Sequence, residues 1–144
     1  LGSIEYGVTV AGVKLVLVLG HTRCGAVTAA VDFYGRQQQE DETSPGSPHL
    51  SAIMREIEPS VNYIEHQQID TMAQDTKLAC VDDVAKLNVL RTVHEITNRS
   101  DAIRDAVRAG RVMVVGALYD VTSGEIEFFS ESAPPHERQA SRRD

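Results

Sequence analysis

The stretch Leu15-Val16-Leu17-Val18-Leu19-Gly20-His21-Thr22-Arg23-Cys24-Gly25 decides the fold. Residues 15–19 are apolar on both faces, which is typical of a strand covered on both sides in a parallel sheet, and Gly20 ends the run. The small residues 26–31 are suited to a helix packed closely on that sheet. A short amphipathic helix over residues 3–11 precedes the strand. This helix-strand-turn-helix order predicts an α/β architecture.

Further elements follow along the chain. Their patterns predict helices over residues 49–58 and 82–98, a helix from Ser100 to Ala109, a buried strand over 112–115, a turn at 122–124 and a returning strand over 126–129. The predicted fold is therefore a mostly parallel central sheet flanked by helices, with a C-terminal hairpin strand. Residues 35–48 are expected to form an exposed loop. We expect one domain over residues 1–129 and a polar, fraying tail over 130–144.

Composition narrows the classes of partner and compartment. A net charge of −7 argues against nucleic acid or an anionic membrane as the main partner. No apolar stretch approaches the about 20 residues that cross a bilayer. The two cysteines, Cys24 and Cys80, form no disulfide framework and suit a reducing compartment, so a cytoplasmic location is expected.

The pair His21 and Cys24 is the candidate metal site. Histidine and cysteine are common zinc ligands, and a spacing of three places them on one side of a tight turn after the strand. Taken alone, the pair is equally consistent with a strand-end histidine and a small buried thiol. The surrounding sequence has to decide between these alternatives.

That surrounding sequence resembles the β-class carbonic anhydrase family. The resemblance rests on Gly20-His21-Thr22-Arg23-Cys24-Gly25-Ala26-Val27 after Gly2-Ser3-Ile4-Glu5-Tyr6, and on Asn88-Val89, Ser100 and Gly116-Ala117-Leu118-Tyr119-Asp120 downstream. It implies a zinc ion held by two cysteines, one histidine and a water that, once ionised, attacks carbon dioxide. On this interpretation His21 and Cys24 are ligands, and no further catalytic residue is identified. Gly25 is expected to keep the turn tight.

The sequence also departs from the family pattern. The family's first cysteine ligand lies upstream in a Cys-x-Asp-x-Arg motif, which these 144 residues do not contain. Asp82 follows Cys80 at the motif's spacing, but Val84 replaces the arginine, so we interpret Cys80 as a core thiol rather than a replacement ligand. Two protein ligands rarely hold catalytic zinc, so weak zinc binding and an inactive isolated chain are expected.

The absent segment would also supply a strand between the two buried strands. Without it we expect that residues 15–19 and 112–115 cannot pair as they would in the family, which would leave backbone groups buried and unpaired. An N-terminally truncated sequence is the preferred explanation, and the alternatives are a segment from a neighbouring subunit or loss of the normal sheet. Arg23 either meets bicarbonate or faces solvent. The remaining histidines are expected to be solvated or packing residues: His49, His66, His94 and His136.

Three functional hypotheses remain. The first is a zinc enzyme that interconverts carbon dioxide and bicarbonate as a homodimer or homotetramer, because the resemblance implies a site built at a dimer interface. The second is a non-catalytic carbonic anhydrase-like binding or assembly module, such as the soluble domain of an anion transporter. The third is a zinc-free protein in which Cys24 is a reactive thiol with His21 beside it.

Overall fold

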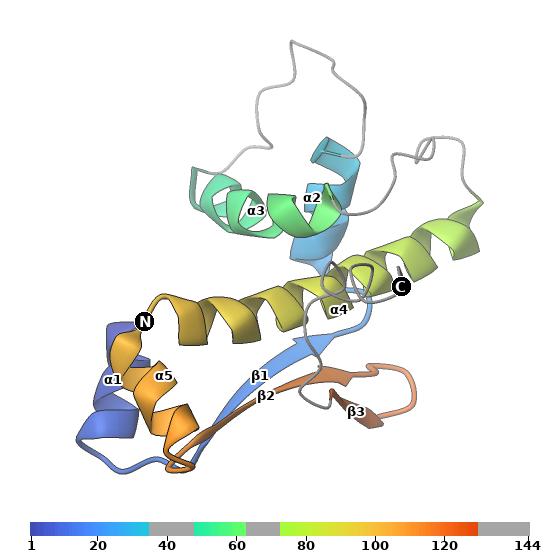
Figure 1. The fold of residues 1–144 in the computed structure, drawn as a ribbon. Coiled ribbons are helices and arrows are strands. Elements are labelled where there is room, and N and C mark those ends of the chain that lie inside the picture. The colour runs from blue at the N-terminus through green and yellow to red at the C-terminus, as the bar shows by residue number, and fades with distance from the viewer. Residues whose placement is uncertain (35–47, 63–72, 130–144) are drawn as a thin grey trace, which may run out of the picture. The chain divides into compact units, whose positions relative to one another are not determined.

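The Leu-rich strand and the turn after it lie in a small α/β fold (Figure 1). The computed structural model describes residues 1–34, 48–62 and 73–129. In chain order the elements are α1 (Gly2–Thr9), β1 (Leu15–His21), α2 (Gly25–Tyr34), α3 (Pro48–Val61), α4 (Gln74–Asn98), α5 (Asp101–Arg108), β2 (Met113–Tyr119) and β3 (Ile126–Phe129). The predicted α/β architecture with a C-terminal hairpin strand is confirmed. The predicted tail and the predicted loop up to residue 47 lie outside the described residues.

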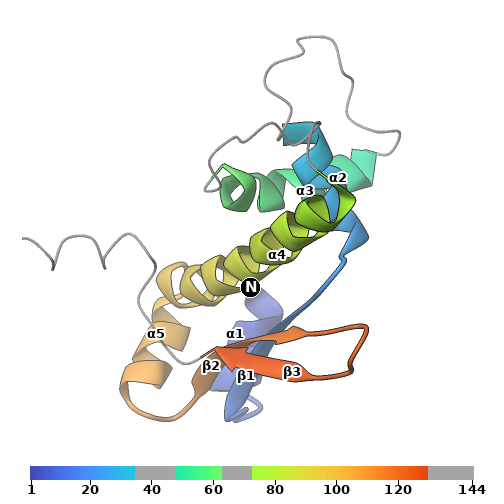
Figure 2. The same ribbon diagram turned by 90° about the vertical axis from the view of Figure 1, so that its right-hand side faces the viewer.

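The sheet has three strands in the order β1-β2-β3. The first two run in the same direction (Figures 1 and 2), and the backbone N–H of Met113 donates to the carbonyl of Lys14 at 3.0 Å where both begin. β2 and β3 pair antiparallel, with Gly116 opposite Phe129 and Tyr119 opposite Ile126. The sheet is thus mixed, because a parallel pair adjoins a hairpin.

The direct pairing of β1 with β2 corrects one expectation. We expected the absent strand to leave backbone groups of residues 15–19 and 112–115 unpaired, whereas the two strands are neighbours in the sheet. Backbone N–H and C=O groups in a strand need partners, and adjacent β2 supplies them to β1.

The described chain divides into two compact units, and the sheet belongs to the first. This unit comprises residues 1–20, 89–119 and the chain from residue 126. Its core is the buried cluster of Ile96, Ile103 and Val114, against which Val16 and Val18 of β1 pack. Ile4 and Val8 of α1 also pack against this cluster, as do Val93 and Val107. Alternate residues of β1 therefore face this core, as the pleat of a strand requires.

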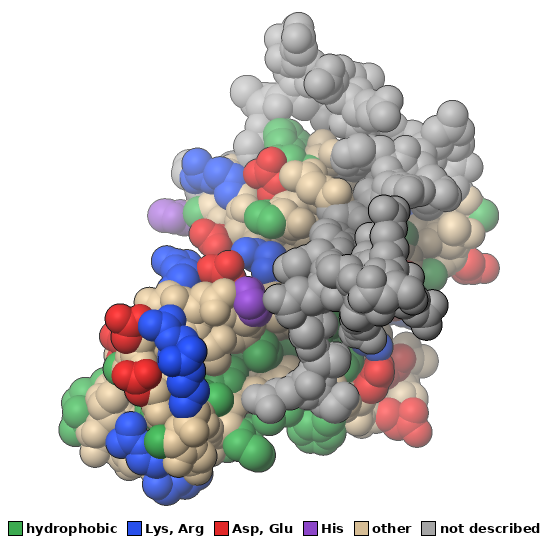
Figure 3. Space-filling view, in the orientation of Figure 1, with side chains coloured by type: hydrophobic (Ala, Val, Ile, Leu, Met, Phe, Trp, Pro, Cys, Tyr) green, Lys and Arg blue, Asp and Glu red, His purple; other side chains and the backbone are tan. Residues whose placement is uncertain are grey.

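The other face of β1 is exposed, which corrects the prediction of a strand covered on both sides. Leu15, Leu17 and Leu19 are 50%, 43% and 50% exposed, and Met113 of β2 and Phe128 of β3 are more exposed still. Figure 3 shows hydrophobic side chains at the surface where the strands lie, while acidic and basic side chains are mixed over α5. The continuous apolar run of residues 15–19 therefore has one face packed in the core and one apolar face at the surface.

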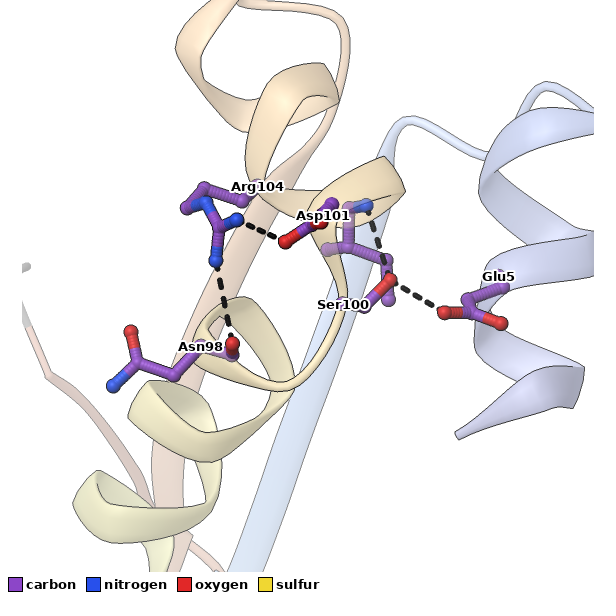
Figure 4. Close-up of polar contacts among 6 residues, drawn as sticks. Glu5, Asn98, Ser100, Asp101 and Arg104 are labelled. Carbon is purple, nitrogen blue, oxygen red and sulfur yellow. Dashed lines mark hydrogen bonds and ion pairs between the residues drawn. The ribbon is translucent and has the colours of Figure 1, made fainter.

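Polar contacts tie α1 to the start of α5 (Figure 4). The Ser100 hydroxyl donates to Glu5 Oε1 at 2.6 Å and accepts from the backbone N–H of Ile103 at 3.3 Å. The second bond makes Ser100 the N-cap of α5, as predicted. Arg104 pairs with Asp101 and donates to the carbonyl of Asn98 at 3.3 Å. The buried Ser100 hydroxyl thus caps the start of α5 and also bonds to Glu5, which lies 95 residues away in the sequence.

The second unit comprises residues 21–88 and 120–125, and it is mainly helical. α2 packs against α3. The buried side chains come from three helices: Val27, Ala30 and Val31 of α2, Met54, Ile57 and Val61 of α3, and Val81, Val84 and Ala85 of α4. Lys77 of α4 also forms an ion pair with Asp32 of α2 at 2.5 Å. These contacts hold α2, and with it the end of the preceding turn.

Two helices, α3 and α4, extend well beyond their predicted ranges. α3 continues to Val61 through Pro59, and the N–H of Asn62 still donates to the carbonyl of Glu58 at 3.0 Å. A proline removes a single backbone donor, and here it does so only in the last turn. α4 begins at Gln74 rather than at Asp82. Asp82 therefore lies within the helix, where its side chain is free to contact another element.

Candidate functional site

The two candidate zinc ligands lie at either end of a short turn. His21 is the last residue of β1, Thr22, Arg23 and Cys24 form the connection, and Gly25 is the first residue of α2. The His21 side chain is exposed, and Cys24 is a half-buried free thiol. The strand fixes the backbone before the turn and the helix fixes it afterwards.

The hydrogen bond of the His21 ring selects the nitrogen that can bind a metal. His21 Nδ1 lies 3.0 Å from the backbone carbonyl oxygen of Thr22. A carbonyl can only accept, so Nδ1 carries the proton and the lone pair resides on Nε2. Metal-binding histidines are commonly oriented by such a bond from their other nitrogen to a backbone carbonyl. The His21 side chain therefore fits the role of a zinc ligand through Nε2.

The conformational strain of the turn falls on Arg23. Its φ is +55°, and it is the one non-glycine residue with positive φ in the parts of the chain that the structure describes. For an L-residue with a Cβ this left-handed conformation costs about 1–2 kcal/mol. Gly25, which we expected to keep the turn tight, begins α2, and a Cβ there would meet nothing within 4 Å. The expectation for Gly25 was wrong, because the tight position lies two residues earlier.

Two side chains hold this strained turn in place. The buried Thr22 hydroxyl accepts the backbone N–H of Val121 at 3.1 Å. The Asp82 carboxylate, from α4, accepts the backbone N–H of Arg23 at 2.6 Å. Hydrogen bonds from an N–H to an ionised carboxylate are among the stronger ones in proteins. Both contacts join segments that are remote in sequence, so the turn is fixed from outside as well as by its flanking elements.

The first turn of α2 fixes the other side of Cys24. The Cys24 carbonyl accepts the backbone N–H of Thr28 at 2.9 Å and its hydroxyl at 3.0 Å. Cys24 therefore occupies the N-cap position of α2, with its thiol at the positive end of the helix.

A second carboxylate lies close to Arg23. Asp120 Oδ1 accepts the backbone N–H of Ser123 at 2.9 Å and that of Thr122 at 2.7 Å. These two hydrogen bonds, with a smaller contribution from the positive charge of Arg23, hold the pKa of Asp120 below its ordinary value. The Arg23 side chain itself is exposed. The two predicted alternatives, that it contacts bicarbonate or that it only faces solvent, stay predictions.

Cys80 differs from Cys24 in its surroundings. It lies within α4 and is half-buried, and burial, with a further contribution from the Asp83 carboxylate, raises the pKa of its thiol. Among the described residues, no three of the types His, Cys, Asp and Glu gather where they could hold one metal ion. Neither Cys80 nor any other described residue therefore forms a three-residue group of this kind with His21 and Cys24.

The other histidines are placed only in part. His49 is exposed near the start of α3. His94 is exposed on α4 and accepts a hydrogen bond from Asn98 Nδ2 at 2.5 Å. His66 and His136 lie outside the described residues. The sequence reasoning missed Thr22 and Asp82 as contributors to the site. For Thr22 a hydroxyl between the two ligands was a usable signal, whereas no sequence signal pairs Asp82 with Arg23.

Comparison with known proteins gives one consistent result. The family model described as carbonic anhydrase matches residues 1–126. A carbonic anhydrase of Mycolicibacterium smegmatis is 34% identical over 130 residues, which cover 90% of this chain and 56% of that protein. Carbonic anhydrase 2 of Mycobacterium tuberculosis is 35% identical over 124 residues, which cover 86% of this chain and 53% of that protein. The chain thus spans slightly more than half the length of these curated relatives.

Solved structures show the same fold at lower sequence identity. The β-carbonic anhydrase CafA of Aspergillus fumigatus superposes with a TM-score of 0.64 at 24% identity, covering 96% of this chain and 59% of that one. A tetrameric β-carbonic anhydrase of Sordaria macrospora gives a TM-score of 0.69 at 22% identity, with 90% and 58% covered. The Coccomyxa β-carbonic anhydrase bound to acetazolamide gives 0.68 at 18% identity, with 96% and 57% covered.

Proposed function

Because the chain belongs to the β-class carbonic anhydrase family, we propose that the complete protein catalyses the zinc-dependent, reversible hydration of carbon dioxide to bicarbonate and a proton. The observation that carries this proposal is the turn between β1 and α2. It presents the Nε2 lone pair of His21 and the thiol of Cys24 from a backbone held at both ends. Zinc, when bound, supplies Lewis-acid activation of water near neutral pH.

The residues of this chain have separate tasks in that reaction. His21 binds through Nε2, while its Nδ1–H bond to the Thr22 carbonyl holds the ring in one orientation. Cys24 would bind through its sulfur, as the thiolate that is the usual cysteine ligand of zinc, from the residue before the first turn of α2. The exposure of His21 leaves the site open to small molecules from solvent, as an exchanging substrate and product require.

A third protein ligand is needed, because catalytic zinc normally has three. The described residues gather none, and the only other cysteine of the sequence is Cys80 in α4. We propose that the third ligand is a cysteine from residues other than these 144, in the family's Cys-x-Asp-x-Arg segment. Its aspartate and arginine would complete the surroundings of the reacting water.

The experiment is a measurement of zinc content and carbon dioxide hydration on the complete protein. We expect one zinc per chain, loss of hydration activity on chelation and recovery when zinc is restored. A chelated protein that keeps its full activity would refute the zinc mechanism. A zinc-replete protein that does not accelerate hydration would instead favour the non-catalytic binding module.

We also propose that the protein works as a homo-oligomer. The support is the apolar sheet surface of Leu15, Leu17, Leu19, Met113 and Phe128, since surfaces of this kind mark interaction sites, and the tetrameric Sordaria enzymes share the fold. A second copy of the chain is the proposed occupant of this surface.

For localisation we propose the cytoplasm. Cys24 and Cys80 are free thiols, which a reducing compartment preserves. In the described part of the chain, no helix has the length and apolar character needed to cross a membrane. Cell fractionation with an antibody against the protein tests the proposal, and recovery in the membrane fraction would favour a transporter-linked domain.

A further inference from the structure

We propose that Asp82 is a positioning residue, which holds the turn between His21 and Cys24 in its metal-binding conformation through the backbone of Arg23. The inference rests on the proposed zinc-dependent function and adds to it a residue outside the zinc-ligand motif. Asp82 lies 59 residues from Arg23 in sequence, on α4, and its Oδ1 accepts the Arg23 N–H at 2.6 Å.

The first step of the argument is that Arg23 needs an external hold. Its left-handed φ of +55° is unfavourable for a residue with a side chain, so the turn would otherwise relax toward other conformations. Strained backbone of this kind persists where surrounding contacts over-determine it. The Asp82 carboxylate supplies such a contact, because its oxygen accepts the Arg23 backbone N–H.

The second step links this hold to the two ligands. On one side of Arg23, the Cys24 carbonyl is fixed by Thr28 in the first turn of α2. On the other side, the peptide group between Thr22 and Arg23 contains the Thr22 carbonyl, which orients the His21 ring. The Thr22 side chain is in turn fixed by Val121. Arg23 is the residue between these two fixed points, so its conformation determines how His21 and Cys24 are placed relative to each other.

The third step concerns what kind of group Asp82 must be. Its partner is a backbone N–H, so the Arg23 side chain is not needed for the contact. An asparagine at position 82 keeps an acceptor oxygen in the same place, whereas an alanine removes it. Asp83 is the matched control, because it carries the same charge on the same helix and is exposed.

The test uses cobalt(II) as a spectroscopic substitute for zinc in the complete protein. We expect Asp82→Ala to weaken cobalt affinity about 10–100-fold, as removal of an outer contact typically does, and to alter the thiolate and ligand-field absorption at equal occupancy. Asp82→Asn should stay within about threefold of the parent, and Asp83→Ala should match it. An Asp82→Ala protein with parental affinity and spectrum would overturn the proposal. Equal losses in Asp82→Ala and Asp82→Asn would assign the effect to charge and also overturn it.

A second measurement does not depend on metal binding or on the folding of a variant. Hydrogen exchange of the Arg23 amide, followed by NMR in the metal-free parent, should be slowed at least about tenfold relative to an unstructured amide. Exchange at the unstructured rate would overturn the role of Asp82 in holding the turn. A parent protein that binds no cobalt but protects this amide would refute the zinc function while leaving the turn contact standing.

Discussion

At the scale of single residues, the candidate site combines a motif readable in the sequence with contacts that only folding creates. His21 and Cys24 followed from their types, their spacing and their place after a strand. The positive φ of Arg23 and its bond to Asp82 did not, because they depend on where α4 passes the turn. The sequence singled out Asp82 only for its spacing from Cys80, which places the two on different sides of one helix.

The ligand assignment predicts distinct effects at the two histidine and two cysteine positions. In the complete protein, His21→Ala and Cys24→Ser should each reduce zinc content to less than about a tenth, because each leaves zinc one protein ligand short. His94→Ala and Cys80→Ser, on α4, should retain parental zinc. Metal analysis after dialysis measures the result. Full zinc in either ligand variant would contradict the assignment.

The lowered pKa of Asp120 predicts how the stability of the fold depends on pH. Its pKa is lowered in the folded chain, so its ionised form stabilises the fold at pH values above the unfolded pKa of about 4, and this contribution is lost as the pH falls through the folded pKa. Asp120→Asn should therefore be less stable than the parent at pH 6, and the difference should shrink below pH 4. Urea unfolding across this range measures it, and a difference that stays constant with pH would contradict the prediction.

At the scale of elements, the types of helices and strands were predictable but their surroundings were not. The apolar run over residues 15–19 indicated a strand, yet periodicity cannot tell a face covered by the same chain from an apolar face at the surface. The start of α4 was missed because its first four residues, 74–77, are all polar. Lateral contacts such as the ion pair of Lys77 with Asp32 stabilise that end of the helix.

Gly116 of β2 provides a prediction at this scale. A Cβ there would lie 2.9 Å from Val89 Cγ1, 3.2 Å from Phe129 Cδ2 and 3.3 Å from Val93 Cγ2. Gly116→Ala should therefore lower the free energy of unfolding by about 1–3 kcal/mol, because the side chains of α4 and β3 have to move away from the added methyl group. Gly2→Ala, where a Cβ meets nothing within 4 Å, is the control and should be neutral or slightly stabilising. Unchanged stability in Gly116→Ala would refute the close packing.

At the scale of the whole molecule, the proposed oligomer predicts sensitivity at the exposed face of β1. Leu17 lies in the middle of this face, and burying a leucine contributes about 1.5–3 kcal/mol. Leu17→Glu places a charge in the proposed interface and should weaken self-association at least about tenfold, as judged by light scattering after gel filtration. Ala102→Glu adds the same charge at an exposed position of α5 and should leave the mass unchanged. A Leu17→Glu protein with the parental mass would exclude this face as the interface.

The link between Ser100 and Glu5 spans 95 residues, and its consequence concerns synthesis on the ribosome. Within the described part of the chain, β1 pairs with β2 and α1 bonds to the start of α5, and both of these partners leave the exit tunnel about 95 residues later. Contacts of such long sequence separation form slowly. The leucine-rich strand is therefore without its β2 partner while residues 22–112 are made, and nascent β1 is a segment on which chaperones would act.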